Sequence, residues 1–580
     1  MLFVKGHGVQ PVIPADRSAY GEGKAMSAAS ACGICRDESC EIGEQLGRFS
    51  YSFPQADGLP DDPALTDALD ALASEMVDNQ PPDAANSTIP PGFTYMGQFI
   101  DHDITANTDR ETGLLLIDTK VVTPLDREAV QNGLGNLRFG SLNLDSLYGG
   151  GPVQGAFAKV LTKALRWPQD RAKLEAGTDS DSPFQAIPLP QDRARDLLRL
   201  GWALKSGQIT AADLDQVPDE LREAFFNPDG TPRLQRALIG DLRNDENLAV
   251  SQFHLAMVRL HNTIVDAAPL SLPHQDRDAV HDWARATTQW TYQWLIVNAY
   301  LPAICDPAIL QEVKDRGAPL YSKFFERNRP HTSDTMPIPL EFSAAAFRFG
   351  HTMVRAEYDW SRNFGRGASA LLPRATFRQL FEFTSAGMSE RRLPEHWPIE
   401  WERFVFASSP DRPDRAARKI DTMLAPPLTS MDNEPAGSFG VMKNLTKRNL
   451  RRGYRLNLPT AQGCLAALAT DHGISLPALT PDQIASGHTG ASVQAGGFEH
   501  QTPLWFYLLK EAELLGHGEC LGPLGSFLVA DTLIGLLRLD PNSYINAAPG
   551  KDGWLPEHAV KPGGEIIRDM PTLMRAVGLL

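Results

Sequence analysis

The sequence predicts a mainly α-helical fold with very little β-structure. Apolar residues recur at helical spacing through most of the chain after residue 190, whereas alternating strand patterns are scarce. No long linker interrupts residues 91–580, so these residues are expected to form one large domain. Residues 1–90 are rich in Gly, Pro, Ser and Asp and are expected to form an extended, loop-rich N-terminal segment.

The individual helices follow from the same spacing. Within the N-terminal segment only residues 67–77 have a helical pattern. Further helices are predicted over residues 247–266, 276–300, 340–358, 503–515 and 525–539. Pro302 is expected to end the second of these five, because proline has no N–H to donate. The helix over 340–358 is predicted to place Phe342, Ala346, Phe349 and Met353 on one face.

Composition excludes several classes of protein. The chain has 580 residues and a formal net charge of −16, from 55 Lys and Arg against 71 Asp and Glu, which argues against a nucleic-acid binder. No run of about 20 apolar residues occurs, so no transmembrane segment is expected. Residues 1–14 lack the apolar core of a signal peptide. We therefore expect a cytoplasmic protein, or one exported by a route without a cleaved signal peptide.

Six cysteines in so long a chain do not form a disulfide framework and fit a reducing compartment. Cys32, Cys35 and Cys40 include one CxxC pair, but a tetrahedral zinc site needs four ligands. Unpaired loop thiols are the simpler interpretation, and a metal or redox role is the alternative.

Four segments carry polar residues that a purely structural helix would not favour. The first is GQFIDHD (97–103), where Gln98, Asp101 and His102 would share one helix face at positions i, i+3 and i+4. The second is GDLRNDEN (240–247), where Arg243 and Glu246 can point the same way. The simpler interpretation of the second segment is that its acids complement a helix N-terminus.

The third segment, RFGHT (348–352), has a glycine inside an apolar helical pattern. Gly350 suggests that something approaches the backbone closely beside His351, whose neutral imidazole could bind a metal or haem iron. The fourth segment is RNLRRG (448–453), which is either a solvated basic helix end or a binding site for haem propionates.

Taken in order, these motifs identify the chain as similar to the animal haem peroxidase superfamily. GQFIDHD, LDSLYG (144–149), GDLRNDE, RFGHT and RNLRRG followed by QGC occur in the family's order, and the resemblance covers roughly residues 90–580. It implies a large single-domain helical haem peroxidase fold. The segment from Thr502 to Leu539 is similar to bacterial members in particular.

The resemblance implies a role for each motif residue. His102 would be the distal histidine that moves the peroxide proton, Arg243 the distal arginine, and Gln98 the distal glutamine. His351 would be the proximal ligand of haem b iron. Asn449 would accept a hydrogen bond from the other ring nitrogen of His351. Arg348 matches the family's arginine three residues before the proximal histidine.

The resemblance also implies how the haem is held. Asp101 and Glu246 occupy the positions whose carboxylates form ester bonds to haem methyl groups in the mammalian members. Where myeloperoxidase has a methionine after that glutamate, this chain has Asn247, so a third covalent bond is not expected.

A calcium site is a further expectation. Asp103 follows the distal histidine as in the family's calcium site, and Ser141, Asn143 and Asp145 alternate along a predicted extended loop. The family usually has Asp where Asn143 stands and Thr where Phe139 stands. The alternative is a plain loop without a metal ion.

The resemblance therefore predicts an enzyme that uses H2O2 to oxidise small donors, either phenolic and aromatic reductants or halide and thiocyanate. One alternative is an oxygenase like the fatty-acid dioxygenases of the superfamily, but their radical tyrosine is replaced here by Arg348. Another is a non-catalytic haem-binding or adhesive module, which usually lacks the distal residues that this chain retains.

Overall fold

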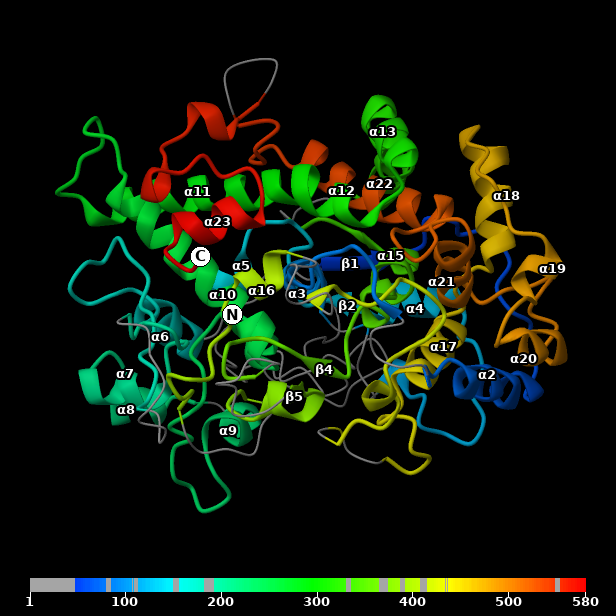
Figure 1. Cartoon of the computed structure of the whole chain (residues 1–580), viewed down its shortest axis with the longest axis horizontal. Helices are drawn as coiled ribbons and strands as arrows, with labels where there is room; N and C mark the ends of the chain where they lie inside the picture. Colours follow the sequence, from blue (N-terminus) through cyan, green and yellow to red (C-terminus); the bar gives the residue numbers. More distant parts are fainter. Residues whose placement is uncertain are drawn as a thin grey trace, which may run out of the picture.

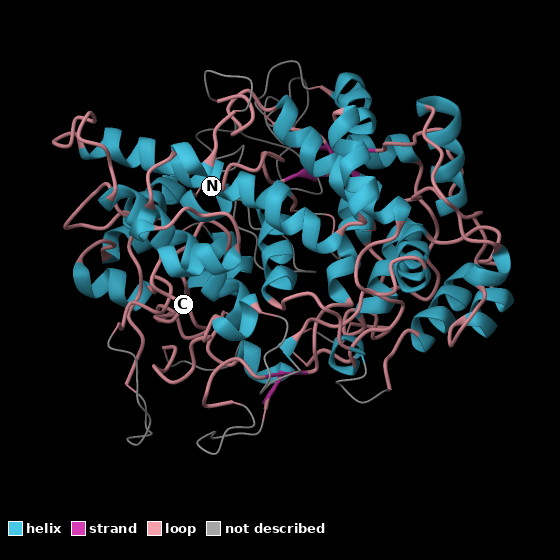
Figure 2. Cartoon of the chain, turned by 45° about the horizontal axis from the view of Figure 1, so that its top comes forward, coloured by secondary structure: helices cyan, strands magenta, loops and turns pink. Residues whose placement is uncertain are grey.

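The computed structural model describes residues 47–79, 85–106, 108, 113–149, 156–181, 192–217, 219–329, 335–364, 374–385, 392–406, 415–432, 434, 437–547 and 553–580 (Figure 1). The cluster of Cys32, Cys35 and Cys40 lies outside these residues. Helices dominate the described chain, and the few strands are short (Figure 2). The prediction of a mainly helical fold is thus confirmed.

Most elements are α-helices. In the first half of the chain they are α2 (Ala64–Glu75), α3 (Gly92–Ile104), α4 (Arg127–Gly133), α5 (Asp145–Tyr148), α6 (Ala156–Ala164), α7 (Leu200–Ser206), α8 (Ala211–Leu214), α9 (Asp219–Phe225), α10 (Leu248–Asp266) and α11 (Arg277–Leu295). In the second half they are α12 (Leu301–Ile304), α13 (Pro307–Arg316), α14 (Pro319–Asn328), α15 (Leu340–Ala344), α16 (Glu402–Val405), α17 (Leu445–Arg455), α18 (Ala461–His472), α19 (Pro481–Ile484), α20 (Gly490–Ala495), α21 (Leu504–Leu514), α22 (Pro523–Leu539) and α23 (Met570–Ala576).

The other elements are short. Among the described residues, η6 (Ile296–Tyr300) is a π-helix. The 3-10 helices are η4 (Gly113–Leu115), η5 (Leu242–Asp245), η7 (Ala346–His351), η8 (Phe377–Phe381), η10 (Pro426–Thr429), η11 (Pro556–His558) and η12 (Pro562–Gly564). Strand β1 (Gly47–Ser50) pairs antiparallel with β2 (Gly135–Asn136) and parallel with β3 (Ile338–Pro339), and β4 (Glu357–Tyr358) pairs antiparallel with β5 (Ala375–Thr376).

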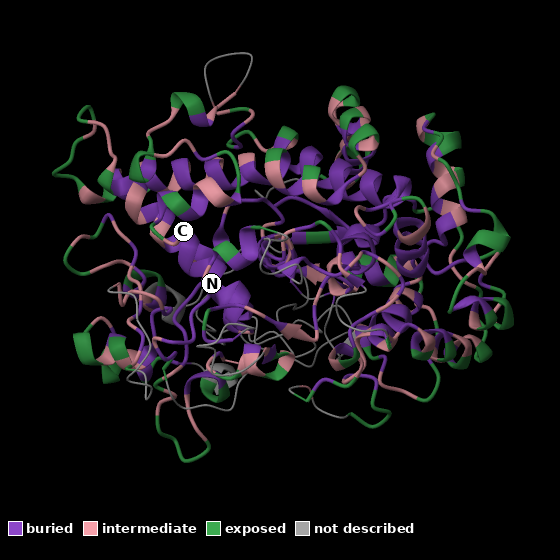
Figure 3. Ribbon diagram, viewed as in Figure 1, coloured by how far each residue is buried: buried purple, intermediate pink, exposed green. Residues whose placement is uncertain are grey.

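A large buried core runs through the long helices, as the purple interior of Figure 3 shows. Helix α10 packs against both α3 and α11, and α17 packs against α2. Phe49 of β1 and Leu69 and Leu72 of α2 belong to this same core, although they precede residue 90. The domain boundary at residue 90 therefore stays a prediction. A second, smaller core gathers residues of α6 to α9 near one end of the molecule.

The expected stop at Pro302 is wrong. Helix α11 continues through the π-turn η6 into α12 and ends only at Ile304. Pro302 is the second residue of α12, where a missing N–H is tolerated. The preceding π-turn supplies the change of register that makes room for the proline ring.

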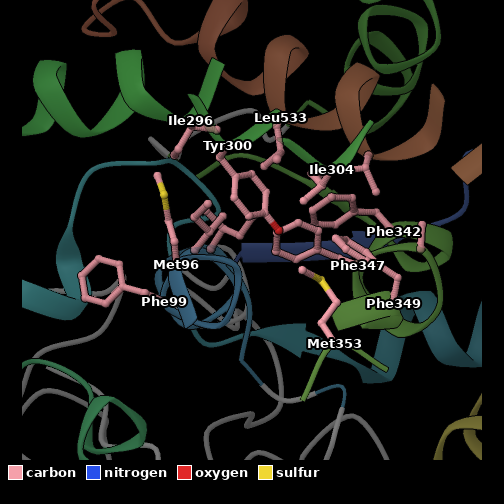
Figure 4. Packing of buried hydrophobic residues seen from close by; sticks show 14 of the residues in the cluster. Met96, Phe99, Ile296, Tyr300, Ile304, Phe342, Phe347, Phe349, Met353 and Leu533 are labelled. Atoms are coloured by element: carbon pink, nitrogen blue, oxygen red, sulfur yellow. The ribbon is translucent and has the colours of Figure 1, made fainter. Parts of the chain in front are cut away.

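The single helix expected over residues 340–358 is also wrong. The chain forms α15, turns at Ala345 (φ −135°, ψ −69°) and continues as the 3-10 helix η7. The turn lets the rings of Phe342 and Phe347 stack with their centroids 4.7 Å apart. In Figure 4 these rings pack beside Tyr300 and Leu533, so tertiary contacts outweigh the local helical pattern.

Close packing between α14 and α22 gives a first prediction. A Cβ on Gly535 of α22 would lie 2.5 to 2.7 Å from side-chain carbons of the buried Tyr321. Gly535→Ala should therefore lower the free energy of unfolding by about 1–3 kcal/mol, measured by denaturant titration. The matched control is Gly453→Ala in α17, where the nearest atom would be 3.7 Å away. This control should be neutral or stabilising by up to about 1 kcal/mol, and equal losses in both variants would contradict the packing explanation.

Candidate active site

A large cavity opens among α3, η7, η8, η10 and α17. It contains about 1320 Å³ of space, counting its mouth. Six of the residues predicted for the site line it: Gln98, Asp101, Glu246, Arg348, His351 and Asn449. Its apolar walls include Tyr300, Phe347, Phe349 and Met353, which Figure 4 shows among the packed hydrophobic residues of the core.

His351 ends the 3-10 helix η7 and lies on the cavity wall, partly exposed. The side-chain nitrogen of Asn449, in α17, lies 2.9 Å from its Nδ1. As placed, the amide donates to the ring, which is the reverse of the predicted direction. A half-turn of the amide would bring its oxygen to Nδ1 and leave Nε2 as the nitrogen with the lone pair.

Gly350 beside His351 faces open space. No atom lies within 4 Å of the position that a Cβ would take there, so the close approach predicted at this glycine is not made by the protein itself. Because Gly350 lines the cavity, the space beside it is available to a ligand.

Arg348 connects η7 to α3. Its Nη1 lies 3.5 Å from Oδ2 of Asp101, and its Nε donates to the backbone oxygen of Ser343 at 2.8 Å. The other carboxylate oxygen of Asp101 accepts from the Thr105 hydroxyl at 2.7 Å. The side chain of Asp101 is thereby held on the cavity wall from two directions.

Gln98 is oriented by a residue whose role in the site was not predicted. Its Oε1 accepts from Nδ2 of Asn247 at 3.0 Å, while Oδ1 of Asn247 accepts from the backbone N–H of Val250 and caps α10. Asn247 and Glu246 both line the cavity. The only sequence signal for this contact was the position of Asn247 directly after Glu246.

His102 and Arg243 do not line the cavity. Both are buried where α3 meets η5. Nη2 of Arg243 donates to the backbone oxygens of His102 (3.1 Å) and Thr105 (2.8 Å) and forms an ion pair with Asp241 at 2.8 Å. The structure therefore brings Arg243 to the backbone of the predicted distal histidine rather than into the cavity.

Asp241 is the centre of a buried charge cluster. Its carboxylate contacts the guanidinium groups of Arg138 and Arg243. Burial by itself would raise the pKa of Asp241, but these two cations hold that pKa well below its usual range. Arg138 also lies 4.0 Å from Asp145. The cluster ties the loop before α5 to η5.

The predicted calcium residues lie partly together. Asp103 accepts from the backbone N–H groups of Leu144 and Ser146, and burial together with the nearby carboxylate of Asp145 raises its pKa. Both carboxylate oxygens of Asp145 are buried and make no hydrogen bond among the described residues. Asn143 does not match the predicted pattern, because its Oδ1 caps the N–H of Asp145.

Neither this cluster nor any other gathers three or more His, Cys, Asp or Glu side chains into a metal site within the described residues. Ser141 is buried in the same loop. Two adjacent buried carboxylates, one of them without hydrogen-bond partners in the described part of the chain, nevertheless fit a hard cation with additional carbonyl and amide oxygens.

The cavity suits a planar group with an iron centre and carboxylate arms. It combines one accessible imidazole, His351, with apolar walls and the guanidinium groups of Arg348, Arg448 and Arg452. Arg448 pairs with Glu434 at 3.2 Å, and Arg452 donates to the backbone oxygen of Thr108 at 2.9 Å. Imidazole, apolar surface and arginine are the groups that bind haem iron, porphyrin and propionates.

Comparison with known proteins shows which family and which fold the chain resembles. Residues 199–390 match the family model of animal haem peroxidase, a span that includes Arg243, Glu246, Arg348 and His351. A peroxidase-like protein of Margaritifera margaritifera is 22% identical over 451 residues, which cover 76% of this chain and 53% of that relative. The chain thus aligns with about half the length of this relative.

Solved structures show the same fold. Peroxidase A from Dictyostelium discoideum superposes with a TM-score of 0.52 at 14% identity, covering 87% of this chain and 88% of that chain. Oryza sativa fatty acid alpha-dioxygenase superposes with a TM-score of 0.50 at 12% identity, covering 84% and 76%. Residues 199–390 of the chain thus match the animal haem peroxidase family, and its fold is similar to that of solved peroxidase and alpha-dioxygenase structures.

Proposed function

We propose that this protein is a haem-dependent peroxidase that uses H2O2 to oxidise small donors. The observation that carries the proposal is the position of His351 and Asn449 in the same cavity as Gln98, Asp101 and Glu246. When bound, haem b would supply an iron centre that passes the oxidising equivalents of H2O2 to a donor.

Each residue then has a defined task. His351 would hold the iron through Nε2, with Asn449 fixing its ring through Nδ1. His102 would take a proton from peroxide at Nε2 and return it to the leaving oxygen. Gln98, held by Asn247, would position peroxide or water by hydrogen bonding. Arg243 would act by holding the backbone of His102 in place.

The arginines of the cavity would bind the propionates of haem, and Asp101 and Glu246 would supply carboxylates for ester bonds to its methyl groups. Asp101 is already held by Thr105 and Arg348, which limits its freedom and keeps one carboxylate oxygen at a fixed place on the wall. We further propose that the chain belongs to the bacterial branch, from the likeness of residues 502–539, which form α21 and α22.

The donor is proposed only as a class, namely phenolic and aromatic reductants or halide and thiocyanate. The apolar side chains of Phe377, Leu380 and Phe381 in the cavity favour an organic donor of modest size. A fatty-acid oxygenase shares the fold, but Arg348 stands where its radical tyrosine would be. Within the described residues, no helix has the length and apolarity needed to cross a membrane.

Replacing the proposed iron ligand tests this function. His351→Ala should abolish the Soret band of a histidine-bound haem and lower peroxidase activity at least about 100-fold, because the iron loses its protein ligand. The measurement is the absorption spectrum of haem-loaded protein before and after stoichiometric H2O2. The control is His500→Ala, which removes an exposed histidine and should leave both unchanged. A normal spectrum and normal turnover in His351→Ala would refute the assignment.

The ester bonds make a separate prediction. After several turnovers with H2O2, haem should resist extraction by acidified butanone in the wild-type protein, because a covalent bond has formed. Asp101→Asn and Glu246→Gln should each release part of the haem, and the double variant should release all of it. Mass spectrometry of the haem peptide gives the same information directly. Full extraction from the peroxide-treated wild type would show that no bond forms.

Calcium gives another prediction. If Ca²⁺ lies between Asp103 and Asp145, chelation should destabilise the fold, because two carboxylates would face each other in a buried site. The loss would be about 3 kcal/mol when free Ca²⁺ had been about 100-fold above its Kd. Thermal unfolding with EDTA, then with added Ca²⁺ or Mg²⁺, measures the effect. No change on chelation, with no calcium found by elemental analysis, would exclude the site.

A further inference from the structure

We propose that Asn244, held by His254, fixes the tautomer of His102, so that the ring carries its proton on Nδ1 and its lone pair on Nε2. Asn244 is thus a positioning residue. The tautomer itself does not depend on the proposed function. Only the use of the Nε2 lone pair to accept a proton from peroxide rests on that function.

Three side chains from three elements form a hydrogen-bonded relay. Nδ1 of His102 in α3 lies 2.8 Å from Oδ1 of Asn244 in η5, and Nδ2 of Asn244 lies 3.2 Å from Nδ1 of His254 in α10. All three side chains are at most 1% exposed. Water therefore does not compete for these bonds, and their direction is set by the protein.

The chemistry of the amide determines the direction of both bonds. An amide oxygen only accepts, so His102 must carry a hydrogen on Nδ1. An amide nitrogen only donates, so Nδ1 of His254 must hold a lone pair. Burial lowers the pKa of His254 to about 3, so this ring is neutral and can accept at that atom.

The opposite orientation of the amide would reverse both tautomers. Its nitrogen would then donate to Nδ1 of His102, and Nε2 would carry the hydrogen. Such a ring could not take a proton at Nε2. If the ring were protonated at Nδ1 instead, its Nδ1–H and the NH2 group of Asn244 would be two donors facing each other without an acceptor. Only the orientation with Oδ1 of Asn244 toward His102 hydrogen-bonds His102 both before and after it accepts a proton at Nε2.

The surroundings hold the relay in place. The N–H of Asn244 donates to the backbone oxygen of Asp241 at 3.0 Å, and Arg243 binds the backbone oxygen of His102. Asp241 and Arg243, which bind the backbone of these two relay residues, are paired with each other. His102 is held at its backbone by an arginine and at its ring by an asparagine.

The test reads the tautomer directly in the haem-free protein. In protein labelled with ¹⁵N-histidine, two-bond ¹⁵N–¹H spectra distinguish the two tautomers, and His102→Gln identifies the signal of His102. We expect wild-type His102 to show a protonated Nδ1 and an unprotonated Nε2. The Nε2–H tautomer in the wild type would overturn the proposal without the need for any further variant.

Two substitutions of Asn244 show whether its hydrogen bond or only its packing sets the tautomer of His102. Asn244→Leu removes both polar atoms at similar size and should give a mixture of tautomers, whereas Asn244→Asp keeps an acceptor oxygen and should retain Nδ1–H. The matched control is His261→Gln, two turns further along α10, where another buried histidine contacts Tyr148 and Ala172 outside the relay. An unchanged tautomer in Asn244→Leu would contradict the proposal.

A second readout uses the haem-loaded protein without turnover. Hydrogen cyanide binds ferric haem as an anion and leaves its proton on the distal base, so the association rate reports the lone pair of His102. Asn244→Leu should slow association by about 10- to 100-fold at neutral pH, and Asn244→Asp by far less. If the wild type binds no haem or lacks peroxidase activity, the proposed function fails. The tautomer measured without haem still decides whether Asn244 orients the ring of His102.

Discussion

A single buried carboxylate, that of Asp241, holds together the two segments on which the site is built. It contacts Arg138 from the loop before α5 and Arg243 from η5, and Arg243 in turn binds the end of α3. All three charges are almost completely buried, so each depends on the others for neutralisation. Removing one partner from such a buried pair typically costs about 3–5 kcal/mol, because it leaves an uncompensated charge.

This arrangement explains why the arginine that resembles a distal catalytic group lies outside the cavity. One guanidinium nitrogen, Nη2, ties η5 to α3 by donating to the backbone oxygens of His102 and Thr105, and this contact holds the backbone at His102 in place. Charge is thus used here to build the site. The cavity itself is mostly apolar, with its arginines placed beside carboxylates or backbone oxygens.

The sequence alone was enough to predict features that depend on local periodicity. The helix over residues 248–266 and the common face of Gln98 and Asp101 in α3 follow directly from a repeat of 3.6 residues. Prediction from the sequence failed where contacts with other elements determine the backbone conformation. The two places are the π-turn before Pro302 and the turn at Ala345. At Ala345 the rings of Phe342 and Phe347 stack on each other, and Phe347 also packs against Tyr300 of η6, and these contacts outweigh the local pattern.

Within the site, the missed residues were asparagines. Asn244 and Asn247 lie in a segment whose polar residues could be explained as helix-capping groups, and Asn247 does cap α10. Their second contacts, to His102 and Gln98, join residues more than 140 positions apart in the sequence. Spacing along one segment carries no signal for such a contact, so only the folded chain reveals it.

Asn247 makes two hydrogen bonds that link the first turn of α10 to the cavity. One end of its amide closes the first turn of the helix, and the other end holds Gln98. If heat or denaturant frays that first turn, the amide is released and Gln98 loses its anchor while the rest of the core is still folded. The cavity would then lose its order at a lower temperature than the molecule as a whole, so that inactivation would precede global unfolding.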